Sequence, residues 1–278
     1  MRATSRAQCR APRPGRGLRD AASRGPARCP GGRRVIGIVA VSHSRALAEA
    51  AVHLALQMGG TEPPVVHVAA GGPDGDLGTD AVAIAASIDE ADSGDGVLVL
   101  MDLGSAILSA ETALEFAGVP ERVRLSPAPF VEGLVAAVVT AAGGAGLDEV
   151  AAEVAGAGEA KRRQLGAADE GVEQPARVAS APDHEPSERA FEAVVVNPSG
   201  LHARPAATFV KAASRYDAEV RIVDLDAGSA EVSGRSLLAL MALGVRQGSR
   251  VRVSATGPQA AQALDELRAL IDDGFGER

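Results

Sequence analysis

The sequence predicts an α/β chain of two domains, an N-terminal doubly wound parallel sheet followed by a smaller α+β domain. Up to about residue 164, short and almost wholly apolar runs of strand length alternate with helical periodicity, as in buried parallel sheets. Residues 165–189 are rich in Ala, Glu, Pro and Ser and lack that periodicity, which is typical of a linker. From residue 190 the expected order becomes β-α-β-β-α-β-α.

In the first domain, residues 35–164, the apolar runs predict strands over 35–41, 64–69, 96–101 and 123–125. Helices are expected over 45–58, from the N-cap Thr79 to 91, from the turn 102–105 to 117, and over 131–142 and 147–164. The apolar face of the first helix carries Leu47, Ala51, Leu54 and Met58.

In the second domain, residues 190–278, strands are expected over 191–196, 219–223, 230–233 and 250–255. Helices are expected over 202–214, 236–243 and 259–271. The first of these places Ala206, Phe209, Val210 and Ala213 on its inward face.

Charge is spread unevenly along the chain. Residues 1–34 hold ten Arg and one Asp, residues 35–188 carry a net charge of −17, and residues 189–278 balance. We interpret residues 1–34 as a disordered Arg-rich stub that comes from a wrong start site, and a basic arm that binds nucleic acid or an acidic partner is the alternative. The favoured interpretation predicts no nucleic-acid partner.

Cysteine usage and hydropathy exclude other classes of protein. Both cysteines, Cys9 and Cys29, lie in the stub, so the rest of the chain has neither a disulfide framework nor a cysteine metal site. No apolar run approaches the ~18 residues that span a membrane. We expect a cytoplasmic protein with no bound metal, no permanent cofactor and no membrane partner.

The most informative segment is NPSGLHARPAA, residues 197–207, where a turn ends and a helix begins at His202. Helix N-termini carry unpaired N–H groups and partial positive charge, so they bind phosphate. Arg204 adds a guanidinium fork suited to phosphate oxygens, and Pro205 fits the first helical turn. These residues together indicate a histidine that carries a phosphoryl group, rather than a surface histidine that caps a helix.

This segment resembles the active-site motif of HPr, the phosphocarrier of the phosphoenolpyruvate-dependent phosphotransferase system. The resemblance runs from about Ala190 to the C-terminus and includes GRSLLALMALGV, residues 234–245. It implies an open-faced α+β sandwich, His202 as the phosphorylated residue and Arg204 as the residue that steadies the phosphate. It also makes Ser236 a candidate regulatory phosphosite, although N-capping of a helix explains this serine fully.

The short helix after Ser236 is crowded with large apolar side chains. Leu237, Leu238 and Met241 lie close to the phosphate site, and they cannot all face the core. We therefore expect part of this set to form an exposed apolar patch that binds enzyme I.

A second histidine, His43, directly follows the first strand, and Asp102 directly follows the third. Ligands of open α/β sheets sit at the carboxyl ends of strands where the strand order reverses, so these side chains face each other if the two strands are neighbours there. A carboxylate on one imidazole nitrogen fixes the tautomer and leaves the other nitrogen free as a nucleophile. Taken alone, a His and an Asp this far apart in sequence are weak evidence for a site, because chance placement explains them about as well.

The strand VIGIVAVSHS, residues 35–44, resembles the active-site strand of mannose-family enzyme IIA domains. Asp102-Leu103-Gly104-Ser105-Ala106 is closer to one branch, the phosphotransferase subunits of bacterial dihydroxyacetone kinases, or DhaM type. The resemblance covers roughly residues 35–160. It implies a homodimer through the N-terminal domain and transfer of phosphate from His43 to ADP on a kinase subunit. Because the chain ends after the HPr-like region, it also implies a separate enzyme I as the donor.

The sequence therefore predicts a phosphotransferase that relays phosphate from enzyme I through His202 and His43 to ADP on a dihydroxyacetone kinase subunit. One alternative is a sugar-transport component that donates from His43 to a IIB protein, which the Asp102-Leu103-Gly104-Ser105 turn disfavours. A second alternative is a regulatory protein that binds its partner according to its phosphorylation state. His53 and His67 fit packing or surface roles better than catalysis.

Overall fold

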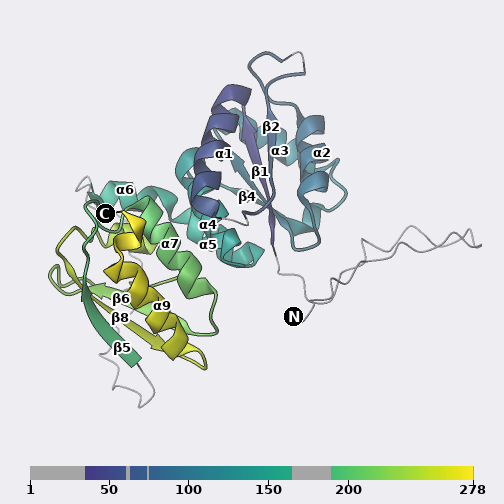
Figure 1. Ribbon diagram of the computed structural model, residues 1–278. Coiled ribbons are helices and arrows are strands. Elements are labelled where there is room, and N and C mark those ends of the chain that lie inside the picture. The colour runs from purple at the N-terminus through teal and green to yellow at the C-terminus, as the bar shows by residue number, and fades with distance from the viewer. Residues whose placement is uncertain (1–34, 61–62, 74, 165–188, 278) are drawn as a thin grey trace, which may run out of the picture. The chain divides into compact units, whose positions relative to one another are not determined.

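The computed structural model describes residues 35–60, 63–73, 75–164 and 189–277 (Figure 1). The stub predicted over 1–34 lies outside the described residues, as does the predicted linker except for its last residue. That residue, Arg189, begins a strand.

The N-terminal domain is built on a parallel sheet of four strands in the order β2-β1-β3-β4. The strands are β1 (Gly37–Ser42), β2 (Val66–Ala70), β3 (Val97–Met101) and β4 (Val123–Ser126). The helices are α1 (Arg45–Gly59), α2 (Ala81–Ala91), α3 (Gly104–Leu114), α4 (Phe130–Ala142), α5 (Leu147–Ala155) and α6 (Ala157–Gln164). The predicted doubly wound parallel sheet is confirmed, and its strand order reverses between β1 and β3.

Side chains of β1 alternate between two cores on opposite faces of the sheet. Ile38 and Ala40 pack with residues of α1 and α4, whereas Val39 and Val41 pack with residues of α2 and α3. The ribbon shows helices on both sides of this sheet (Figure 1). Every residue of β1 and β3 is buried, which explains why both strands are continuous apolar runs. With helices on both faces, the carboxyl ends of these strands are the place where polar side chains reach solvent.

The buried face of α1 differs from the predicted one. Leu47 is 47% exposed and Leu54 is 42% exposed. The helix buries small side chains instead: Ala48, Ala51, Val52, Ala55 and Gly59. Helix α1 packs closely on α4, where a Cβ added to Gly59 would lie 2.9 Å from Val138. Close packing therefore selects small residues for the buried face, a preference that apolar periodicity alone does not reveal.

The C-terminal domain has an antiparallel sheet in the order β5-β8-β6-β7. The strands are β5 (Arg189–Val194), β6 (Glu219–Asp224), β7 (Val232–Ser233) and β8 (Arg250–Thr256). The helices are α7 (Ala203–Ser214), α8 (Leu237–Ala242) and α9 (Ala260–Asp272), followed by a 3-10 turn over Gly274–Gly276. The predicted element order is confirmed. The inward residues predicted for α7 are all buried: Ala206, Phe209, Val210 and Ala213.

Several helices have different limits from the predicted ones. The N-cap of α2 is Asp80 instead of Thr79, and its side chain accepts from the Val82 and Ala83 N–H groups. The single helix expected over 147–164 is divided at Gly156, which is the C-cap of α5 and, as a glycine, a poor helix former. Helix α3 already begins at Gly104, so Gly104 and Ser105 open a helix instead of lying in a turn. Among the helices of the described part of the chain, none has the length and apolar character needed to cross a membrane.

Candidate functional site

His43 and Asp102 lie at the carboxyl ends of the two central strands. β1 and β3 are hydrogen-bonded neighbours, and the Asp102 N–H donates to the Val41 carbonyl at 3.2 Å. His43 follows the last residue of β1, and Asp102 follows the last residue of β3. The structure thus brings together the two residues that the sequence analysis placed at the switch point of the sheet.

The Asp102 carboxylate accepts hydrogen bonds from the residues that end β1 and from its own neighbour Leu103. Its Oδ1 lies 2.9 Å from His43 Nδ1, and its Oδ2 accepts from the His43 backbone N–H at 2.9 Å. Ser42 Oγ donates to Oδ2 at 2.9 Å, and the Leu103 N–H donates to Oδ1 at 2.7 Å. An ionised carboxylate only accepts hydrogen bonds, so His43 Nδ1 carries the ring proton and Nε2 holds the free lone pair.

Asp102 is ionised in this environment. Burial favours the neutral acid and acts to raise the pKa, because only 7% of the Asp102 side chain is exposed. The hydrogen bonds from the His43 backbone, the His43 ring, Ser42 and Leu103 outweigh that effect and hold the pKa of Asp102 below its ordinary value of 3.8. A negative charge therefore stays beside Nδ1 at neutral pH.

Ser105 contacts the other ring nitrogen of His43. Its Oγ lies 2.8 Å from Nε2, and because Nε2 holds the lone pair, the hydroxyl is the donor. Ser105 lies in the first turn of α3, whose N-cap Leu103 offers no side-chain acceptor. The amide groups of this turn and the Ser105 hydroxyl together suit an anion attached at Nε2. Ser105 belongs to the motif Asp102-Leu103-Gly104-Ser105-Ala106, but its sequence pattern predicted no role for the hydroxyl.

His202 is the N-cap of α7, and its side chain makes no capping hydrogen bond. A tight turn leads into it: Asn197 Nδ2 donates to the Gly200 carbonyl at 2.7 Å, and the Leu201 N–H donates to the Val245 carbonyl at 3.0 Å. Gly200 has a φ of 65°, and a Cβ there would lie 2.1 Å from the Val245 carbonyl oxygen, so only glycine fits. The His202 ring consequently lies at the N-terminus of α7, where the sequence motif placed it.

One ring nitrogen of His202 is occupied by a carboxylate near the end of the chain. Glu277 Oε2 lies 3.1 Å from His202 Nε2. The other nitrogen, Nδ1, makes no capping bond to α7. Arg204 is exposed in the first turn of the same helix, as expected of a group that meets an incoming phosphate. No sequence signal pointed to Glu277, because it is distant from the motif and lies in no element.

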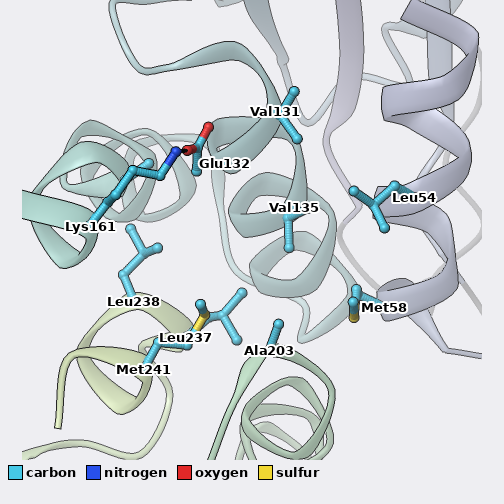
Figure 2. A pocket seen from close by; sticks show the side chains of 11 residues that line it. Leu54, Met58, Val131, Glu132, Val135, Lys161, Ala203, Leu237, Leu238 and Met241 are labelled. Carbon is cyan, nitrogen blue, oxygen red and sulfur yellow. Dashed lines mark ion pairs between the residues drawn. The ribbon is translucent and has the colours of Figure 1, made fainter. Parts of the chain in front are cut away.

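The remaining predicted residues lie on α8. Ser236 is its N-cap and accepts a hydrogen bond from the Ala239 N–H at 3.0 Å, which confirms the capping role. Leu237, Leu238 and Met241 project from one side of this helix (Figure 2). Leu237 is only 1% exposed and belongs to the core, whereas Leu238 and Met241 are half-buried. Of the three residues, only Leu238 and Met241 remain candidates for the partner-binding surface.

The other described histidines lie apart from both sites. His53 is exposed on α1, and His67 on β2 lies with its Nδ1 3.4 Å from Glu90 Oε2. Glu132 of α4 forms an ion pair with Lys161 of α6 (Figure 2), and the hydrogen bond from Lys161 lowers the pKa of Glu132. These contacts fit surface and packing roles.

Comparison with known families defines the class of this chain. Residues 37–151 match the family described as PTS system fructose IIA component, and residues 190–273 match the family of the PTS HPr component phosphorylation site. His43 and Asp102 fall within the first match and His202 within the second. The chain belongs to the phosphotransferase-system proteins and joins a IIA domain to an HPr domain.

Phosphoryl donor subunits named DhaM are similar to this chain across both domains. The phosphoryl donor subunit DhaM of the PEP-dependent dihydroxyacetone kinase from Escherichia coli (strain K12) is 39% identical over 247 residues, 87% of this chain and 51% of the relative. The DhaM from Klebsiella michiganensis matches with the same identity and coverage. The chain spans about half the length of these relatives.

The HPr-like part also has matches of its own. A multiphosphoryl transfer protein from Haemophilus influenzae is 48% identical over 90 residues, 32% of this chain and 18% of that protein. The crystal structure of HPr-C-His from Thermoanaerobacter tengcongensis is 36% identical, with 32% of this chain and 98% of that chain covered and a TM-score of 0.31.

Proposed function

We propose that this chain is a phosphoryl relay that takes phosphate from enzyme I on His202, passes it to His43 and delivers it to ADP bound by a dihydroxyacetone kinase subunit. The observation that carries this proposal is the pairing of each histidine with a carboxylate through one ring nitrogen only. His43 Nε2 lies beside the first turn of α3, and His202 is the N-cap of α7. Each ring is thus a nucleophile next to an anion site.

The chemistry is an exchange of phosphorus bonds. The lone pair of the acceptor nitrogen attacks phosphorus, the bond from phosphorus to the donor breaks, and its electron pair returns to the donor. In the last step an oxygen of the terminal ADP phosphate is the nucleophile, and the electron pair returns to His43 Nε2. The protein supplies position and charge: Asp102 offsets the positive charge that the phosphorylated His43 ring acquires, and Ser105 donates to the phosphoryl oxygens.

The similarity to phosphoryl donor subunits of PEP-dependent dihydroxyacetone kinases supports this acceptor over a sugar-transport IIB protein. The proposal includes a cytoplasmic location. Assembly as a homodimer through the N-terminal domain, a role of Ser236 as a phosphosite, and the absence of a permanent cofactor stay predictions.

Phosphate entry is tested by incubating the chain with phosphoenolpyruvate and enzyme I and mapping the label. His202→Ala should abolish labelling of the whole chain, because it removes the entry nucleophile. His53→Ala is the matched control, since it removes an exposed imidazole from α1. Label that persists in the C-terminal domain of His202→Ala would refute the assignment.

The acceptor is tested by competition. The chain labelled at both histidines is offered ADP-loaded dihydroxyacetone kinase subunits or a IIB protein. We expect loss of label to the kinase subunits only. Transfer to the IIB protein alone would establish the sugar-transport function instead.

A further inference from the structure

Near its C-terminus, the chain makes a turn that returns to the His202 site. After α9, Gly274, Phe275 and Gly276 all have left-handed backbone conformations, with φ values of 67°, 57° and 75°. The Phe275 conformation costs about 1 kcal/mol for a residue with a side chain. A Cβ added to Gly274 would lie 3.5 Å from Asn197 Cβ, so this turn packs against the loop that leads to His202.

The turn delivers one carboxylate to the imidazole. Glu277 Oε2 lies 3.1 Å from His202 Nε2, and the Glu277 N–H donates to the Gly274 carbonyl at 2.9 Å. The Glu277 side chain is 22% exposed, whereas that of His202 is 43% exposed. The carboxylate is thus partly shielded from solvent while the ring stays open to a partner.

We propose that Glu277 is a positioning residue that keeps the proton of His202 on Nε2 and leaves the Nδ1 lone pair free to accept phosphate. An ionised carboxylate accepts hydrogen bonds and cannot donate, so the 3.1 Å contact requires N–H at Nε2. The inference rests on the proposed function of His202 and assigns it a partner equivalent to Asp102 at His43.

The carboxylate also acts on the charge of the phosphorylated ring. When Nδ1 forms its bond to phosphorus, the bond from phosphorus to the donor breaks and its electrons leave with the donor. The His202 ring then carries a positive charge, with its proton still on Nε2. Glu277 offsets that charge without taking part in bond formation, as orienting carboxylates do beside other nucleophilic histidines.

The test compares Glu277→Ala, Glu277→Gln and the control Glu192→Gln, which removes an exposed carboxylate from β5. Nitrogen-15 NMR of the unphosphorylated chain at about pH 9, where an imidazole is neutral, reports the protonation of each ring nitrogen. In Glu277→Ala, the two nitrogen shifts of His202 should move toward each other as the second tautomer becomes populated. The amide oxygen of Glu277→Gln still accepts the hydrogen bond, so its shifts should stay near those of the unaltered chain.

The kinetic arm measures phosphorylation of His202 by enzyme I. Glu277→Ala should lower kcat about tenfold with little change in KM, and Glu277→Gln should recover most of that loss. Unchanged nitrogen shifts in Glu277→Ala, or moved shifts with an unchanged kcat, would overturn the proposal. The NMR measurement needs no enzyme I, so it tests the role of Glu277 independently of the relay. If the proposed function of His202 were wrong, His202 of the unaltered chain would stay unlabelled, and that result is distinct from the NMR result.

Discussion

His43 and His202 are held through opposite ring nitrogens. Asp102 Oδ1 lies 2.9 Å from Nδ1 of His43, whereas Glu277 Oε2 lies 3.1 Å from Nε2 of His202. The nitrogen left free for the proposed nucleophilic role is therefore Nε2 in the N-terminal domain and Nδ1 in the C-terminal domain. In the proposed relay, a phosphoryl group that passes between the two histidines changes from one kind of phosphohistidine to the other.

This difference predicts two distinct phosphohistidine isomers in one chain. Labelled His43→Ala should show only the isomer substituted at Nδ1, because His202 is then the sole carrier. A complete relay should show both isomers. Phosphorus-31 NMR of the two samples separates the isomers, and the same isomer at both positions would contradict the tautomers derived from the carboxylate contacts.

The Asp102 contacts predict a pH-dependent contribution to stability. Asp102→Ala leaves the part-buried His43 backbone N–H without its acceptor and should lower the unfolding free energy of the N-terminal domain by about 1–3 kcal/mol at neutral pH. Because the folded pKa of Asp102 is depressed, this contribution is complete above its ordinary value of 3.8 and is lost as the pH falls through the folded pKa.

Hydrogen exchange of the β1 and β3 amides, measured at pH 7 and at pH 3, checks this prediction. The difference between Asp102→Ala and the unaltered chain should shrink at the lower pH. Glu49→Ala removes a carboxylate that is 60% exposed and should change stability by less than about 0.5 kcal/mol. An equal difference at both pH values would argue against an ionised Asp102.

Ser105 is expected to support transfer without serving as the nucleophile. Ser105→Ala removes the hydroxyl at 2.8 Å from His43 Nε2 and should slow transfer from His43 roughly a hundredfold. Ser105→Thr keeps the hydroxyl and should retain most of the rate. Ser109→Ala, which removes a hydroxyl from the next turn of α3, is the control. Equal single-turnover rates for the two alanine variants would exclude this role of Ser105.

The half-buried pair Leu238 and Met241 is expected to bind enzyme I. Leu238→Asp or Met241→Asp should lower kcat/KM for phosphorylation of His202 at least about tenfold, since apolar anchors dominate binding energy. Val194→Asp makes the same kind of change at an exposed site on β5 and should have little effect. Circular dichroism must show intact folding. An unchanged rate in a folded variant would remove this helix from the binding surface.

The elements with the strongest periodicity were the most predictable from sequence. β1 and β3 are buried on both faces, so their apolar runs identify them without any tertiary information. The buried face of α1 was predicted wrongly, because close contact with α4 favours Ala48 and Ala55 over Leu47 and Leu54. The division between α5 and α6 occurs at one residue, Gly156. A hydrophobic pattern read over many residues does not detect such a local break.

Some residues of the two candidate sites were predictable from sequence, and others were not. His43 and Asp102 were placed from the rule for strand ends, and the N-cap position of His202 from its local motif. The role of Ser105 was not predicted, because its contact with His43 Nε2 depends on α3 starting at Gly104. Glu277 was not predicted, because only the folded turn after α9 brings it to His202, and no pattern in the sequence encodes that approach.

The central claim is that phosphate passes from His202 to His43 before it leaves the chain. The most direct test is formation of dihydroxyacetone phosphate from phosphoenolpyruvate, enzyme I, this chain, ADP-loaded kinase subunits and dihydroxyacetone. His43→Ala should still take label on His202 and should yield no product. Normal product formation by His43→Ala would show that His202 donates directly, and the two-step relay would have to be abandoned.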